Sequence, residues 1–144
     1  MRSHHGRCHC GNIELDFETA LAPDEIEIRA CQCSFCRKHA SRAAADPAGR
    51  LTLRVGDAAL LSRYRFGLQT AEYWVCRACG VYVAAITIED SAPRGIVIVN
   101  ALDEAGLFAR APIAADYDAE SRPARLARRR ERWTPVVVEG VAGL

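Results

Sequence analysis

The stretch Tyr73-Trp-Val-Cys76-Arg-Ala-Cys79-Gly80 decides the fold, because it joins a β-strand pattern to a turn with paired cysteines. Aromatic and β-branched residues lead up to Cys76, as in a strand that is largely buried. Cys76 and Cys79 have the spacing with which a tight turn presents two thiolates to zinc, and Gly80 relieves the backbone after it. The apolar run over residues 81–88 then predicts a returning strand.

The other five of the seven cysteines stand in two earlier groups. Cys8-His-Cys10-Gly11 places two thiols at alternate positions, which face the same side of a strand. Cys31-Gln-Cys33-Ser-Phe-Cys36 packs three thiols into one short segment. Two doublets joined by a long segment make a closed, structural four-thiolate site, whereas a triplet leaves a tetrahedral metal one position for water or substrate. The spacing therefore predicts a structural zinc at Cys8, Cys10, Cys76 and Cys79 and a reactive zinc at Cys31, Cys33 and Cys36.

Other groupings of the cysteines are open at this point. Cys8 and Cys10 could instead join two of the central thiols, although Cys76 and Cys79 would then lack partners. A lone CxxC pair can also serve as a redox pair. Zinc is the expected metal because glycine-flanked cysteine turns suit tetrahedral thiolate coordination, and iron is not excluded. We expect two zinc ions per chain, with partial occupancy at the three-ligand site because three ligands hold zinc less tightly than four.

The composition fits a single zinc-binding domain over residues 1–144. The chain is 50% hydrophobic and 26% charged with a net charge of +1, so no global field points to nucleic acid or a membrane. Its N-terminus lacks the apolar segment of a secretory signal, and its apolar runs are far too short to span a bilayer. We therefore expect a cytoplasmic protein with no membrane partner, in which clustered cysteines are metal ligands rather than disulfides.

Hydrophobic periodicity predicts short strands with turns between them, which favours a mainly antiparallel sheet. The predicted strands cover residues 12–18, 25–30, 51–55, 72–76, 81–88, 96–99 and 136–139, with a turn at 91–95. Residues 36–46 are alanine-rich and predict one or two helical turns, whereas residues 58–66 fit helix or strand equally. Residues 119–133 predict a C-terminal helix with Pro123 in its first turn.

These motifs resemble those of the glutathione-dependent formaldehyde-activating enzyme family, which also includes centromere protein V. The resemblance rests on Gly6-Arg-Cys-His-Cys-Gly11, on Cys31-x-Cys33-x-x-Cys36-Arg-Lys38 and on the stretch from Tyr73 to Gly80. Residues 55–64 and Ala101-Leu-Asp103 are similar to further elements of the family. The resemblance covers about residues 6–105, with residues 106–144 as an extension.

The resemblance implies a β-tent fold of the Mss4-like type, with antiparallel sheets around a structural zinc, to which this chain adds a short C-terminal helix. It implies the same division of the cysteines, with the four outer ligands structural and the central triplet catalytic. It also implies a carbon–sulfur lyase type of reaction, in which formaldehyde and glutathione, or another small thiol, form an adduct such as S-hydroxymethylglutathione. The alternative is a non-catalytic two-zinc module that binds a protein or nucleic-acid partner. No motif marks an anion site for the carboxylates of glutathione.

Basic and histidine side chains near the triplet are further candidates. His39 could shuttle a proton or hydrogen bond to a metal ligand, although an exposed polar residue is the simpler interpretation. Arg37 and Lys38 could attract an anionic ligand or form a solvated surface pair.

The remaining candidates lie toward the ends of the chain. Residues 122–132 carry six arginines without aromatic interleaving, so we interpret them as a solvated helix face and do not expect a nucleic-acid partner. Trp74 and Trp133 are expected in the core or at a hinge, and His4 and His5 in a disordered terminus.

Overall fold

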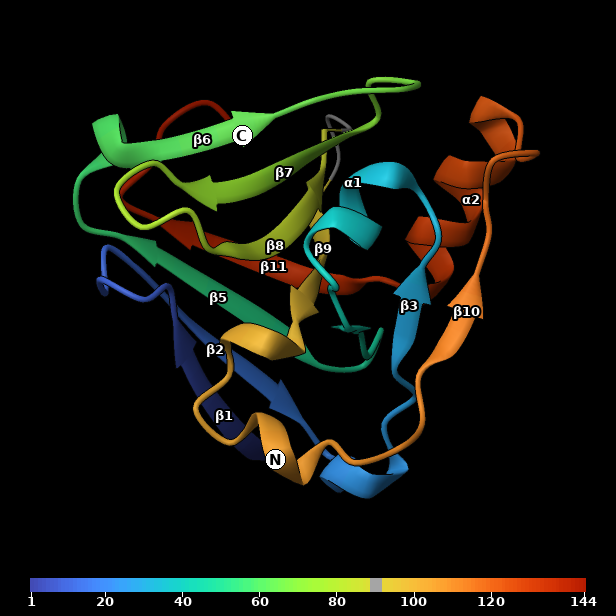
Figure 1. Cartoon of the computed structure of the whole chain (residues 1–144), viewed down its shortest axis with the longest axis horizontal. Helices are drawn as coiled ribbons and strands as arrows, with labels where there is room; N and C mark the ends of the chain where they lie inside the picture. The colour runs from blue at the N-terminus through green and yellow to red at the C-terminus, as the bar shows by residue number, and fades with distance from the viewer. Residues whose placement is uncertain (89–91) are drawn as a thin grey trace.

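The computed structural model describes residues 1–88 and 92–144, which form a mainly β protein with two α-helices (Figure 1). The strands are β1 (Arg2–Arg7), β2 (Ile13–Thr19), β3 (Arg29–Cys31), β4 (Ala43–Ala44), β5 (Arg50–Val55), β6 (Leu61–Tyr64), β7 (Ala71–Cys76), β8 (Tyr82–Thr87), β9 (Arg94–Ile98), β10 (Ile113–Ala115) and β11 (Thr134–Glu139). The helices are α1 (Ser34–Lys38) and α2 (Arg122–Arg132), and short 3-10 turns cover Pro23–Glu25, Ala58–Leu60, Val99–Ala101 and Ala105–Leu107.

The sheet branches at β9. One edge of β9 pairs with β8, which continues to β7 and β6. The other edge pairs with β4 toward Ile98 and with β11 toward Gly95. From β4 the sheet runs to β3 and β10, and from β11 it runs to β5, β2 and β1. Figure 1 shows these wings, with β6, β7 and β8 above, β5, β2 and β1 below, and α2 beside β10 and β3. The pairings are antiparallel except for β3 with β10 and β5 with β11.

Strands with alternating apolar residues and strands that are apolar throughout lie in different places in this sheet. In β2, Ile13, Leu15 and Phe17 are fully buried, and Leu15 faces Leu53 of β5 across the sheet. These residues form one core with Trp74, which lies on β7. By contrast β8 is buried at every position, because both its faces are covered, and its sequence therefore lacks alternation. The fold class expected from the sequence, mainly β with a short C-terminal helix, is confirmed.

One local expectation differs in position and one was wrong. The helical turn expected within residues 36–46 begins earlier, because α1 covers Ser34–Lys38 and Ala40 takes a positive φ of 48° before the chain enters β4. The N-terminus is not disordered, since it forms β1 along the edge of β2, and His4 is buried between the rings of Phe17 and Phe108.

Several other expectations were correct in kind and differ in extent. The stretch 25–30 contributes buried Ile26 and Ile28, but only β3 at its end is a strand. Residues 58–66, ambiguous in sequence, form a 3-10 turn and then β6. Helix α2 begins after its Ser121 cap with Pro123 in the first turn. The expected turn at 91–95 lies partly outside the described residues.

Candidate metal centres

The first cysteine cluster joins two turns that are far apart in the sequence. Cys8 and Cys10 lie in the turn after β1, rather than on one face of a strand as expected. Cys76 and Cys79 lie at the turn between β7 and β8, where the Gly80 amide donates to the Cys76 carbonyl at 2.8 Å. Gly80 takes a φ of +79°, the left-handed conformation that glycine adopts without strain.

The sulfur positions in this cluster fit a tetrahedral metal. The Cys8 and Cys10 sulfurs are 3.7 Å apart, and those of Cys10 and Cys76 are 3.6 Å apart. All four sulfurs lie within 4.8 Å of one another. Zinc–sulfur bonds of about 2.3 Å in a tetrahedron separate the sulfurs by about 3.8 Å, whereas a disulfide needs about 2.0 Å. The Ile13 amide also donates to the Cys8 sulfur at 3.3 Å, as amides near metal-bound thiolates do. This cluster could therefore hold a metal ion.

The second cluster is assembled at the junction of β3 and α1. Cys31 ends β3, Cys33 caps α1 by accepting the Cys36 amide at 3.4 Å, and Cys36 is 5% exposed within the helix. Their three sulfurs lie within 4.8 Å of one another, so this group could also hold a metal ion. The structure thus gathers the seven cysteines as a group of four and a group of three, and Cys8 and Cys10 do not meet the central thiols.

The three central thiols change one another's pKa. Hydrogen bonding from the Cys36 thiol lowers the pKa of Cys31 to about 6, and the same contact raises the pKa of Cys36. The first thiolate therefore forms on Cys31 and the other two thiols retain their protons. A divalent metal removes this restriction because it stabilises all the sulfurs as thiolates.

A ring cluster fixes the triplet on the sheet. Phe35 stands between Cys33 and Cys36 in sequence, and its ring contacts Tyr73 of β7 and Tyr82 of β8 at centroid distances of 5.1 and 5.0 Å. Phe66 packs against both Phe35 and Tyr73. Because α1 is too short to be stable by itself, this aromatic packing is what stabilises it on the sheet.

A cavity of about 370 Å³ opens beside the triplet. It exists because β10 runs parallel to β3 and aligns Ala115 with Cys31, after which the chain returns over the triplet and enters α2. The cavity is lined by two cysteines of the triplet, by aromatic residues and by arginines of both helices. Its lining includes Cys31, Cys33, Arg37, Phe66, Tyr73, Tyr117, Asp118, Arg125, Arg128 and Arg129.

Only part of the arginine set of α2 forms the solvated face that the sequence suggested, because Arg122, Arg130 and Arg132 are exposed and the other three are not. Arg125 and Arg128 both pair with Glu120, at 3.2 and 2.7 Å, and Arg129 is only 4% exposed. Arg128 and Arg129 follow Arg125 by three and four residues, so the three arginines lie on one side of the helix. This spacing was the feature of the sequence that could have indicated a shared face. What the sequence could not show is that this side faces the cysteine triplet.

The other candidates near the triplet have definite places. Arg37 lines the cavity, whereas Lys38 is exposed outside it. His39 is exposed and its ring packs against Phe35 and Tyr82. Trp74 and Trp133 are both buried, as expected.

The fold and its cysteine groups define a mainly β protein with two sites that could hold metal ions. The chain matches the family model described as glutathione-dependent formaldehyde-activating enzyme over residues 3–119. It is also similar to the crystal structure of a Rhodobacter sphaeroides protein solved by structural genomics, with 33% sequence identity and a TM-score of 0.52, over 69% of this chain and 87% of that one. The chain belongs to the glutathione-dependent formaldehyde-activating enzyme family. No helix among the described residues is long and apolar enough to cross a membrane.

Proposed function

We propose that the protein binds two zinc ions and makes or breaks a carbon–sulfur bond in a thiol adduct, such as S-hydroxymethylglutathione formed from formaldehyde and glutathione. In this proposal Cys8, Cys10, Cys76 and Cys79 hold a structural ion within a single domain of residues 1–144. Cys31, Cys33 and Cys36 hold the catalytic ion. The observation that carries the proposal is the three-thiol cluster, of which Cys31 and Cys33 line a cavity of about 370 Å³, in a chain that matches this enzyme family.

The triplet suits thiol chemistry. When bound there, zinc supplies an open coordination position that favours an incoming thiol in its nucleophilic thiolate form. The thiolate sulfur gives an electron pair to the aldehyde carbon, the π pair of the carbonyl moves to its oxygen, and that oxygen takes up the proton that the thiol released. The reverse reaction breaks the same carbon–sulfur bond and returns the proton to the thiol. Tyr73 lines the cavity, and burial raises its pKa to about 12. Its hydroxyl therefore keeps its proton at neutral pH and can donate a hydrogen bond to the aldehyde oxygen.

Metal analysis of two cysteine variants tests the division of the sites. We expect about two zinc ions in the wild-type chain, as four-ligand and three-ligand sites predict. Cys76→Ser should lose metal together with folding, whereas Cys36→Ser should lose about one ion and remain folded by circular dichroism. If both variants unfold alike, the triplet is not a separate open site.

Exchange spectroscopy tests the reaction itself. NMR can follow the exchange of formaldehyde between water and glutathione with and without the protein, with Cys36→Ser as the matched control. We expect acceleration by the wild-type protein and none by the variant. A wild-type rate equal to the spontaneous rate would exclude formaldehyde and glutathione as the substrates, and the same result with other thiols would favour the non-catalytic module.

A further inference from the structure

Arg129 carries a buried guanidinium that no carboxylate among residues 1–88 and 92–144 pairs with. Arg129 is 4% exposed, its Nη1 donates to the Thr70 hydroxyl at 2.6 Å, and its Nε is buried with no acceptor among the described residues. The guanidinium lies over the ring of Trp133 at 4.5 Å, and none of the described carboxylates forms an ion pair with it. Burial lowers the pKa of this arginine, since a desolvated charge is disfavoured. Such a group is costly unless an anion compensates it.

Arg129 belongs to a wall with an excess of positive charge. Four arginines line the cavity beside the triplet. Among the described residues, Asp118 is the carboxylate in its lining, and Glu120 pairs with Arg125 and Arg128. Three cysteinates around a divalent zinc carry one net negative charge, so even an occupied metal site leaves this wall positive. The unbalanced charge faces the same space as the sulfurs of Cys31 and Cys33.

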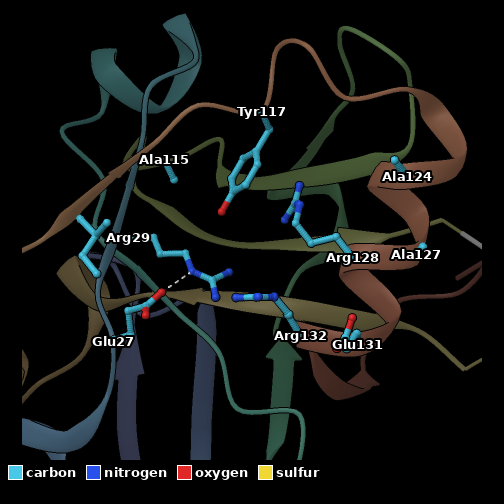
Figure 2. Close-up of a pocket in the computed structure, with 10 residues that line it drawn as sticks. Glu27, Arg29, Ala115, Tyr117, Ala124, Ala127, Arg128, Glu131 and Arg132 are labelled. Carbon is cyan, nitrogen blue, oxygen red and sulfur yellow. Dashed lines mark hydrogen bonds and ion pairs between the residues drawn. The ribbon is translucent and has the colours of Figure 1, made fainter.

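A second, outer cavity of about 630 Å³ on the other side of Tyr117 and Arg128 is a weaker candidate (Figure 2). Figure 2 shows Arg29 pointing toward Arg128 and Arg132, and the dashed line marks its ion pair with Glu27. The outer cavity therefore contains an arginine whose charge is already compensated, and the cysteines do not line it. The inner cavity has the buried charge to which no carboxylate in the described part of the chain is paired.

We propose that the arginine wall of α2, with Arg129 at its centre, is a carboxylate subsite that selects acidic thiols as ligands of the cysteine triplet. This inference rests on the proposed function, because the triplet is taken to hold the sulfur end of the same molecule. A carboxylate matches the forked geometry of a guanidinium, and Arg129 lines the cavity in which such a carboxylate would lie. The arginines lie in α2, beyond residues 3–119 that match the family model, so this subsite comes from the extension of this particular chain.

Binding of S-methylglutathione to the zinc-loaded full chain tests the subsite separately from catalysis. This probe keeps both carboxylates of glutathione but has no thiol to ligate a metal, and its diethyl ester removes both negative charges. By calorimetry we expect the acid to bind about tenfold to a hundredfold more tightly than the ester, as charge-assisted hydrogen bonds predict. Arg129→Met should reduce this ratio to about one, because methionine fills similar space without charge.

Two further variants keep the test decisive. Arg130→Met removes an exposed arginine of the same helix that does not line the inner cavity, and the acid-to-ester ratio should stay at the wild-type value. If Arg129→Met does not fold, Arg128→Gln replaces a partly exposed member of the wall and should lower the ratio about threefold or more.

The opposite outcomes are equally clear. Equal binding of acid and ester, or no binding of either, overturns the subsite, and tighter binding of inorganic phosphate overturns its assignment to carboxylates. Loss of zinc in Arg129→Met with an unchanged acid-to-ester ratio would make Arg129 a counter-charge to the cysteinates instead. Acid-over-ester preference without accelerated formaldehyde exchange would keep the subsite and exclude the proposed reaction, and the reverse pattern would do the opposite.

Discussion

Glu72 is the buried charge on which we base the most quantitative stability prediction. It is 2% exposed on β7, and its carboxylate accepts from Arg63 at 2.9 Å, Arg65 at 2.8 Å and Trp74 at 3.2 Å. Arg63 also donates to the carbonyls of Ala142 and Gly143, so the same network ties the end of the chain to β6. The strand that carries Glu72 ends in Cys76 and contains Tyr73, and its position therefore affects both cysteine clusters.

We expect Glu72→Gln to lower the free energy of unfolding by about 2–3 kcal/mol. Removing one partner of a buried ion pair costs about 3–5 kcal/mol, and the lower figure applies because glutamine keeps one acceptor and both arginines are partly solvated. This corresponds to a fall in melting temperature of about 4–12 °C for a domain of this size. Urea unfolding followed by circular dichroism measures the difference. The matched control is Glu27→Gln, whose ion pair with Arg29 has the same 2.9 Å distance but an exposed carboxylate, and which should change stability by less than about 1 kcal/mol.

The pH dependence gives an independent check on Glu72. Burial by itself raises the pKa of Glu72, but hydrogen bonds from Arg63, Arg65 and Trp74 outweigh it and lower the pKa below its ordinary value of 4.5. A carboxyl with a lowered folded-state pKa contributes its full stability above pH 4.5 and loses it as the pH falls through the folded value. The difference between wild type and Glu72→Gln should therefore be constant near neutral pH and shrink below pH 4.5. A difference of under about 0.5 kcal/mol at neutral pH would refute the argument that this network is a tightly coupled buried pair.

Three further perturbations follow from the packing. Gly95→Ala would place a Cβ 2.7 Å from the Ala85 carbonyl where β8, β9 and β11 meet. It should lower the free energy of unfolding by about 2 kcal/mol, which a lower urea midpoint would report. Burial lowers the pKa of His4, so the unfolded chain binds a proton first and stability should fall as the pH drops below 6.5; replacing His4 with phenylalanine should remove that part of the pH dependence. Truncation after residue 119 removes β11 from between β5 and β9, and the shortened chain should show no cooperative unfolding transition.

Strands with an apolar face could be predicted from the sequence, and strands without one could not. Ile13, Leu15 and Phe17 alternate because one face of β2 meets the core, so their strand is visible in the sequence. The strand β1 has mostly polar side chains, and its pairing with β2 depends on backbone hydrogen bonds that leave no side-chain pattern. The role of Gly6 becomes clear only from the structure, where a Cβ at this position would lie 2.5 Å from the Ala101 carbonyl.

The cysteine groups could be predicted because metal ligation restricts spacing strongly. Short intervals such as that between Cys76 and Cys79 reflect the geometry of one turn, and this geometry does not depend on how the rest of the chain folds. The arginine wall could not be predicted, because it depends on which element lies opposite the triplet. That contact arises from the parallel pairing of β10 with β3. These two strands are far apart in the sequence, and their pairing depends on how the rest of the sheet is arranged.

The extension beyond the family match contributes both to the sheet and to the cavity. Helix α2 continues directly into β11, and β11 pairs with β5 and β9 in the middle of the sheet. Trp133 at their junction is buried, and its carbonyl accepts from Arg94 at 2.9 Å, so the end of the helix is fixed to the sheet. Ser121 caps the start of the helix. Because the end of α2 is fixed to the sheet and Arg129 packs over the ring of Trp133, packing positions this guanidinium although none of the described carboxylates pairs with it. The cysteines and the arginines thus lie on separate parts of the chain, and ligand selection by α2 can change without altering a single metal ligand.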